Sequence, residues 1–382
     1  MVIAARSRRR RLRCPRCGIQ KTGQHSASLR RWRHLGVWGR KVRIEAEIRR
    51  MRCGPCGRVV TEDVAWSRHG SDFTRPFEDA VALMAQKVDK TAVSRLFGIS
   101  WVTVGKIAER VVGELLDPER LRDLRRIGVD EISFRKRHRY LTIVTNHDTG
   151  RVVWVAEGKS SEVLKDFFRE IGPEACAVIE IVTMDMSAAY RKAVEESLPD
   201  AQIAYDHFHS AKLANEALNE VRRDLVRSVR DTDSASAKAI KSMRWPTLYR
   251  MDRVPEKHAD SLALLRPDQP LGRAVLLKES LLDVLGGRGS TSRRMRALRD
   301  WVQWAARCRL RPFVRLGRTI RSHLGGIRAF LEHRVTNALA EGINNKVRLL
   351  SHRAYGFHSA PPLIATIHLC CGGIRLPELQ LL

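Results

Sequence analysis

Hydrophobic and polar positions divide the chain into segments with different periods. Residues 41–48 alternate between polar and apolar side chains, a period of two that predicts a β-strand. Between residues 74 and 112 the apolar side chains recur every three or four positions, which predicts helices. After residue 126, short apolar runs separated by turn residues predict strands alternating with helices. We therefore expect a multi-domain α/β protein, and 382 residues allow two or three domains.

The helical segment follows the layout of a helix-turn-helix. After a first helix that starts near Thr74, a short helix at 91–97 ends at Gly98, and Ser100 is suited to cap a third helix from Trp101 to about Val112. A short helix, a glycine turn and a capped recognition helix are typical of DNA-binding domains. A three-helix bundle without a ligand is the alternative. The exposed face of the third helix is expected to carry the DNA contacts Trp101, Thr103, Lys106 and Arg110.

The segment after residue 126 predicts the order βββαβαβ, beginning with an antiparallel meander at 127–133, 140–145 and 151–156. This order places Asp130 on the first strand and Asp185 at the carboxyl end of the fourth, a strand expected at 178–184. These two strands are neighbours in a ribonuclease-H-like sheet, so both carboxylates converge. Buried like charges are costly without a cation between them, which indicates Mg²⁺ or Mn²⁺. Taken singly, each aspartate is more typical of a turn or a helix cap.

A third acid comes from a helix expected at 336–350. Its apolar stripe is formed by Leu339, Ile343, Val347 and Leu350, and its polar face carries Glu341, Asn344, Asn345 and Arg348. A solvated helix face is the alternative. It accounts for the charges but not for an Asn-Asn pair, because asparagine has poor helix propensity.

Four of the eight cysteines form two knuckles, Cys14-Pro15-Arg16-Cys17 and Cys53-Gly54-Pro55-Cys56. A two-residue spacer places both thiolates of a knuckle on one side of a tight turn. Two knuckles supply four ligands for one closed, structural Zn²⁺ site. Four unrelated buried thiols are the alternative. The predicted strand between the knuckles favours a zinc ribbon.

A helical stretch at about 212–334 separates the predicted sheet from the helix with the third acid; its Trp301 and Trp304 share a helix face and are expected in the core. The expected fold is an N-terminal zinc ribbon, a helix-turn-helix, and an RNase-H-like mixed sheet interrupted by a helical insertion. The expected domains are a zinc-binding module (1–70), a helix-turn-helix (71–115), the first part of the core (127–210), the helical insertion (211–334) and the last core helix (335–365).

Charge favours a polyanionic partner. The chain carries a net charge of +28, and residues 1–60 hold 18 Lys and Arg against Glu45 and Glu47 alone. Neutralising phosphates releases counterions and strengthens binding. A solubility tail or a patch for anionic membranes is the alternative. No apolar run approaches the length of a bilayer span and no secretory signal is visible, so we expect no membrane partner and a cytoplasmic location.

Several motifs together resemble the ISL3 family of bacterial insertion-sequence transposases, over nearly the whole chain. They are Ile127-Gly128-Val129-Asp130-Glu131, Met184-Asp185-Met186-Ser187, Asp206-His207-Phe208-His209, and residues 337–346 followed by Arg353-Ala354-Tyr355-Gly356-Phe357. The resemblance implies an RNase-H-like DDE catalytic domain with its triad at Asp130, Asp185 and Glu341. Residues 369–382 do not resemble a core element of the family.

The motif at 206–209 resembles an Asp-x-x-His signature of several DDE transposases with insertions. His209 is therefore a candidate catalytic residue that contacts the scissile phosphate beside the metals. The alternative is that Asp206 caps a helix and His209 is a packed neighbour.

The expected function is DNA transposition by metal-dependent cleavage and strand transfer. Two Mg²⁺ or Mn²⁺ ions, roughly 3.5 to 4 Å apart, would be held by Asp130, Asp185 and Glu341. The zinc module and helix-turn-helix would bind the terminal inverted repeats, with Asn345 and Arg348 as further DNA contacts. Joining two ends to a double-stranded target demands a homodimer or higher oligomer on DNA. The alternatives are a transcriptional regulator with an idle RNase-H-like domain, and a nuclease without joining activity.

Overall fold

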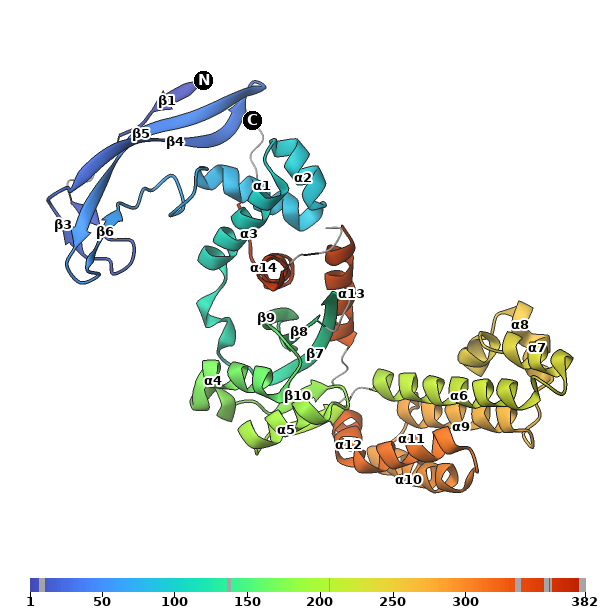
Figure 1. Ribbon diagram of the computed structural model, residues 1–382. Helices are drawn as coiled ribbons and strands as arrows, with labels where there is room; N and C mark the ends of the chain where they lie inside the picture. The colour runs from blue at the N-terminus through green and yellow to red at the C-terminus, as the bar shows by residue number, and fades with distance from the viewer. Residues whose placement is uncertain are drawn as a thin grey trace.

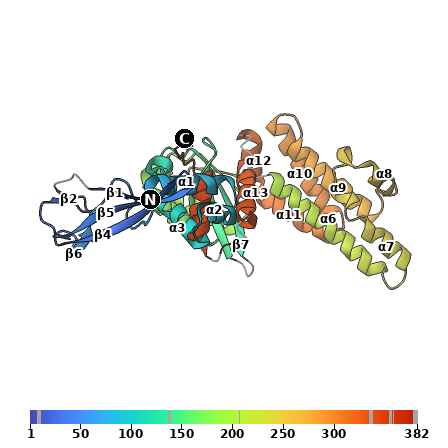
Figure 2. The same cartoon turned by 90° about the horizontal axis from the view of Figure 1, so that it is seen from above.

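The computed structural model describes residues 1–6, 11–135, 139–205, 207–333, 338–353, 357 and 359–377. Figures 1 and 2 show four parts in succession: a β-structured N-terminal arm, a small helical unit, an α/β unit, and a group of long helices. Within the described ranges, no helix has both the length and the apolar character that a bilayer span requires.

The N-terminal arm is built on a long antiparallel hairpin. Strand β5 pairs with β4 along most of its length, with β1 in parallel, and with β6 at its far end. The predicted alternation is observed, because Val42, Ala46 and Ile48 are buried whereas Lys41, Arg43 and Glu47 are exposed. The strands are β1 (Val2–Ala4), β2 (Leu12–Arg13), β3 (Gln20–Lys21), β4 (Ser26–Val37), β5 (Arg40–Cys53) and β6 (Arg58–Thr61).

The helix-turn-helix has the predicted caps. Thr74 accepts a hydrogen bond from the N–H of Phe77, and Ser100 accepts one from the N–H of Thr103. Gly98 ends the second helix at φ 56°, a left-handed conformation that favours glycine. The helices are α1 (Arg75–Lys87), α2 (Lys90–Phe97) and α3 (Trp101–Leu115). Their shared core includes Phe77, Val93 and Ile107.

A five-stranded mixed sheet forms the centre of the α/β unit. Its order is β11-β10-β7-β8-β9, with β7, β8 and β9 antiparallel and with β10 parallel to both β7 and β11. The strands are β7 (Arg126–Arg135), β8 (Arg139–Asn146), β9 (Arg151–Glu157), β10 (Ile181–Met184) and β11 (Gln202–Tyr205). The expected start of the fourth strand at Val178 was wrong, because Val178 caps helix α4 in a helical conformation.

Helices cover both faces of this sheet. One face packs on α4 (Ser161–Ala177) and α5 (Ala188–Ser197) through a core that includes Val129, Phe167 and Tyr190. The opposite face packs on α13 (Ala338–Arg353) and α14 (Ala360–Cys371) through Ile132 and Val347 among others. Successive side chains of β7 alternate between these faces, so Asp130 lies on the α13 side.

Among the described residues, seven α-helices lie between β11 and α13 in the chain: α6 (His207–Val229), α7 (Ser234–Ser242), α8 (Glu256–Ala263), α9 (Pro270–Gly286), α10 (Thr291–Arg307), α11 (Arg311–Ser322) and α12 (Leu324–His333). Helix α6 spans the expected boundary at 210–211 without a break. Helix α12 packs on β11, where a Cβ on Gly326 would lie 2.3 Å from the Tyr205 ring. Trp301 is buried as expected, but Trp304 is 39% exposed, so its expected core position was wrong.

Candidate functional site

The four cysteines of the two knuckles lie together at the end of the N-terminal arm. Cys14 and Cys17 lie in the turn between β2 and β3, Cys53 is the last residue of β5, and Cys56 lies in the turn between β5 and β6. All four sulfur atoms lie within 4.8 Å of one another, with 3.8 Å from Cys14 to Cys56 and 3.4 Å from Cys17 to Cys53. Tetrahedral Zn–S bonds of about 2.3 Å require S···S separations of about 3.8 Å. The arrangement therefore fits one zinc ion.

The pKa values of these thiols are also consistent with a bound cation. The backbone N–H of Cys17 helps to lower the pKa of the Cys14 thiol to about 6. Hydrogen bonds with Cys17 and Cys53 raise the pKa of Cys56 to about 12. One thiol ionises readily and another resists, because thiolates this close together repel each other. A divalent cation removes that repulsion.

A second cluster of chemistry-bearing residues lines a cavity of about 680 Å³ where β7, β10, α6 and α13 meet. The structure brings Asp130, Asp185, His209 and Glu341 to this one cavity, as the sequence predicted. Strands β7 and β10 pair in parallel with Thr183 opposite Gly128. Asp185 and Asp130 each follow this pair by two positions, so they lie at the same edge of the sheet.

The carboxylate of Asp130 has a specific environment. It accepts hydrogen bonds from the backbone N–H of Glu131 at 2.7 Å and from Nδ2 of Asn344 at 2.5 Å. Burial, with a further contribution from the negative charge of Asp185, raises the pKa of Asp130 to about 6. Burial likewise raises the pKa of Glu131. A raised pKa means that the ionised carboxylate is destabilised, and a cation bound between two such carboxylates stabilises their ionised forms.

The side chain of Asn344 independently indicates that the cavity suits a polar ligand. Its side chain is 6% exposed, and its Oδ1 has no hydrogen-bond partner within the described ranges. A buried acceptor without a partner suits a water or hydrated cation in the adjacent cavity. The donor set of Asp130, Asp185 and Glu341 consists of oxygen ligands, the type that Mg²⁺ and Mn²⁺ prefer. The residues present therefore fit a divalent metal. The carboxylate oxygens of these three residues do not lie as close together as the four cysteine sulfur atoms. Within the described residues, the four cysteines form the one tight cluster of candidate metal ligands.

Sequence reasoning overlooked several residues of this cavity. Those that also line it are Glu131, Lys212, Asn215, Glu216, Asn219 and Arg244. Four of them lie on one face of α6, at i, i+3, i+4 and i+7 from Lys212, a pattern that the sequence could have indicated. Arg348 lines the cavity, whereas Asn345 is exposed and does not. Asp206, the partner expected for His209, lies outside the described residues.

The candidate DNA contacts on α3 divide into two groups. Lys106 is exposed and Thr103 is half-buried near the start of the helix. Arg110 instead pairs with the fully buried Glu78, with Nε 2.8 Å from Oε1. The ring of Trp101 has Nζ of Lys90 4.0 Å from its centroid. Trp101 and Arg110 are therefore half-buried rather than exposed, because buried partners draw both side chains inward, and their contact with DNA stays a prediction.

Comparisons with known proteins agree with this division of the chain. Residues 127–367 match the transposase domain family of the ISL3 type. Residues 10–56 match the zinc finger of the transposases of IS204, IS1001, IS1096 and IS1165. Residues 62–112 match the helix-turn-helix domain of the ISL3 transposase family. The chain belongs to the ISL3 family of transposases.

Two transposases are similar to most of the chain. The transposase for insertion sequence element IS1557 of Mycobacterium tuberculosis (strain CDC 1551 / Oshkosh) is 38% identical over 95% of this chain and 86% of its own length. The transposase for insertion sequence element IS1001 of Bordetella parapertussis is 29% identical over 90% of this chain and 85% of its own length. The zinc-ribbon and helix-turn-helix matches indicate that this ISL3 chain binds DNA and support a structural zinc ion.

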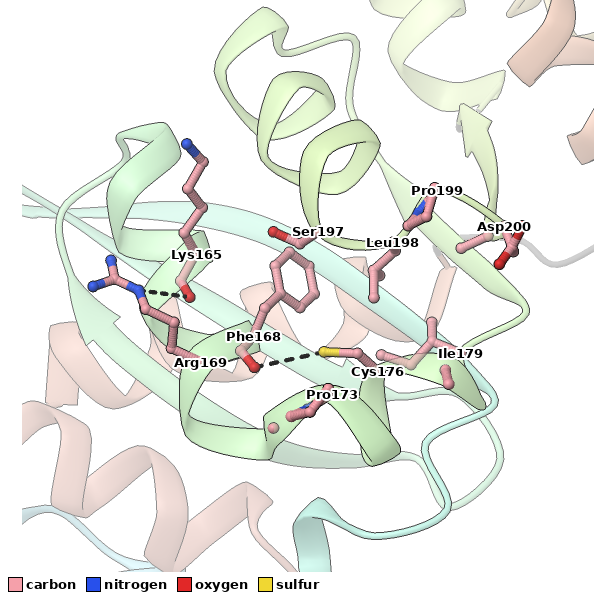
Figure 3. Close-up of a pocket in the computed structure, with 13 residues that line it drawn as sticks. Lys165, Phe168, Arg169, Pro173, Cys176, Ile179, Ser197, Leu198, Pro199 and Asp200 are labelled. Atoms are coloured by element: carbon pink, nitrogen blue, oxygen red, sulfur yellow. Dashed lines mark hydrogen bonds between the residues drawn. The ribbon is translucent and has the colours of Figure 1, made fainter.

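Another cavity of this ISL3 chain, of about 620 Å³, lies at the opposite end of the parallel strands (Figure 3). It is lined by Ile179 and Ala201, which precede β10 and β11, and by Phe168 and Cys176 of α4. The kink of α4 at Gly172 lies in its lining, and the thiol of Cys176 donates to the Phe168 carbonyl at 3.5 Å, a bond drawn in Figure 3. Open α/β sheets bind ligands at the carboxyl ends of their strands, which favours the cavity of Asp185 as the functional site.

Proposed function

We propose that the chain is a DNA transposase that binds the terminal inverted repeats of its insertion sequence and catalyses metal-dependent strand cleavage and strand transfer. The single observation that carries this proposal is the meeting of Asp130, Asp185 and Glu341 with cationic side chains in one cavity of an ISL3-family chain. The strand order and the seven helices between β11 and α13 support an RNase-H-like core with a helical insertion. We propose the domains expected from the sequence, except for the boundaries at 210–211 and 365, which lie inside α6 and α14.

Asp130, Asp185 and Glu341 would hold two Mg²⁺ or Mn²⁺ ions. When bound, such ions activate a water or 3′-hydroxyl and stabilise the leaving oxygen of an in-line displacement at phosphorus. The chain's own residues prepare this site. Asn344 and the N–H of Glu131 fix the Asp130 carboxylate, and the N–H of Ser187 donates to Asp185 at 3.1 Å.

The remaining residues of the cavity suit a phosphodiester. Lys212, Arg244 and Arg348 bring positive charge to its lining, which attracts the DNA backbone next to the acids. His209 would donate a hydrogen bond to the scissile phosphate, which assigns it a role beside the acids rather than as a metal ligand. On α3, Thr103 and Lys106 would contact DNA, and Asn345 and Arg348 would do so on α13. Two ends and one target require at least a dimer on DNA.

The test is cleavage of DNA that carries the ends of the element, in Mg²⁺ and in Mn²⁺. The wild-type chain is expected to nick at the ends and to join them to a target plasmid. Asp130→Asn, Asp185→Asn and Glu341→Gln should each slow cleavage by about 10³-fold or more while end binding persists, because an amide keeps the shape and loses the charge. Asp200→Asn, in the other cavity, serves as control. Wild-type rates in Glu341→Gln would remove Glu341 from the triad, and end binding without cleavage would favour a regulator.

A further inference from the structure

A groove of about 690 Å³ runs along the helical part where α6 passes α7 and the turn η2 (Pro246–Leu248). Arg244 lines both this groove and the cavity of Asp130 and Asp185. The groove and the proposed catalytic cavity therefore adjoin at Arg244. A DNA strand that leaves the reacting phosphate in this direction would enter it.

Most of the cationic side chains that line the groove have no acidic partner among the described residues. Arg222, Arg223, Lys241 and Arg244 line it, and none forms an ion pair with a residue in the described ranges. Glu220, the acid in the groove lining, is bound by Arg315 at 2.6 Å. Burial and the charges of neighbouring arginines lower the pKa of Arg222. Unpaired cations that repel one another are stabilised by an anionic partner.

An exposed aromatic ring stands at the end of this groove. Trp245 is 60% exposed, and the guanidinium carbon of Arg244 lies 5.0 Å from its ring centroid. The segment around it is fixed from beneath, because the fully buried Lys278 donates to the carbonyls of Thr247 at 2.9 Å and Tyr249 at 2.6 Å. Burying an ammonium is costly unless it has such partners. The fold thus holds Trp245 in an exposed position on a rigid support.

We propose that this groove binds single-stranded DNA next to the cleavage point, with Trp245 stacked on an unpaired base and with Arg223, Lys241 and Arg244 on the phosphates. A cationic groove combined with an aromatic platform is the recurrent solution for single strands, whereas bases inside a duplex have no free face for stacking. This inference rests on the proposed function, since it takes DNA as the substrate of the adjoining cavity.

The test compares two DNA probes: a duplex that carries an unpaired thymidine tail, and the same duplex without the tail. Affinities of the full-length, zinc-loaded protein are measured without Mg²⁺ or Mn²⁺, so that no cleavage contributes. Trp245→Ala should weaken binding of the tailed probe by about tenfold and leave the blunt probe unchanged, whereas Trp245→Phe should retain most of the affinity. Trp304→Ala, which removes another exposed tryptophan of the helical part, should change neither.

The salt dependence of binding tests the proposed phosphate contacts separately. Lys241→Gln and Arg223→Gln should each reduce the dependence of log K on log salt concentration by about 0.7 on the tailed probe, the value for one phosphate of a single strand. Equal losses on both probes, or no loss in Trp245→Ala, would overturn the proposal. A wild-type chain that prefers the tailed probe through Trp245 but never cleaves DNA would refute the proposed function alone.

Discussion

The side-chain amide of Asn344 donates a hydrogen bond to Oδ2 of Asp130 at 2.5 Å, although 214 positions separate the two residues in the sequence. Asn344 lies on α13, which Ile343 and Val347 anchor against the sheet. The packing of these apolar neighbours sets the rotation of the helix about its axis. That rotation turns Asn344 toward Asp130 and leaves Asn345 exposed.

Asn344→Ala is expected to lower cleavage by about 10- to 100-fold and to raise the metal concentration needed for half-maximal activity. Removing a side chain that orients a metal ligand typically has an effect of this size. Leu349→Ala, on an exposed position of the same helix, is the matched control. Titration of Mg²⁺ at saturating DNA measures the change. An unaltered metal dependence in Asn344→Ala would show that the amide does not support the site.

His209→Ala separates a catalytic role from a packing role. A contact with the scissile phosphate predicts cleavage slowed by about 10²-fold at an unchanged melting temperature, the scale of one lost transition-state contact. The half-buried position of His209 in the lining of the Asp185 cavity motivates the substitution. Both quantities are measured on one preparation. A less stable protein that cleaves at the normal rate would assign His209 to packing.

Cys53→Ser is expected to release one zinc ion per chain and to weaken recognition of the transposon ends, because structural zinc supplies folding free energy to a small module. The control is Cys176→Ser, which alters a half-buried thiol on α4 outside the cluster. Elemental analysis and end-binding assays measure the two effects. Protein purified without chelator that contains no zinc would contradict the assignment.

His368 on α14 predicts a pH dependence of stability. Burial, with a smaller contribution from Arg120, lowers the pKa of His368 from 6.5 to about 4. Above pH 6.5 the ring is neutral in both states, so it adds no pH dependence. Between pH 6.5 and 4 the unfolded chain binds a proton that the folded chain does not, which lowers the free energy of unfolding by up to about 3 kcal/mol.

Substitution of His368 by leucine should remove this loss. The melting temperature of wild-type protein is then expected to fall more between pH 7 and pH 5 than that of His368→Leu. Loss of zinc in acid affects both proteins alike, so the difference between the two curves isolates His368. Parallel curves would mean that the ring accepts a proton in the folded state.

Local patterns predicted much of the fold because their causes are local. The cap residues Thr74 and Ser100 and the turn at Gly98 act within a few positions of the chain, and each is observed. The spacing within each cysteine knuckle is equally local. Short apolar runs between turn residues predicted the strands of the mixed sheet, with the start of β10 misplaced.

Contacts across the structure account for the predictions that failed or were never made. Helical spacing assigned Arg110 to an exposed face, but it could not foresee that α1 would present the buried carboxylate of Glu78 to it. In the same way, nothing near Trp245 in the sequence indicates that Lys278 fixes its segment.

By itself the sequence determined the zinc ligands, the helix-turn-helix and the strands that carry Asp130 and Asp185, because turn geometry, capping and side-chain alternation depend on neighbouring residues. Only the tertiary structure decided that Asn344 supports Asp130, that α6 lines the cavity with Lys212, and that a cationic groove leads away from it. These relationships depend on how whole helices rotate and pack, and that is set by apolar contacts between residues far apart in the chain.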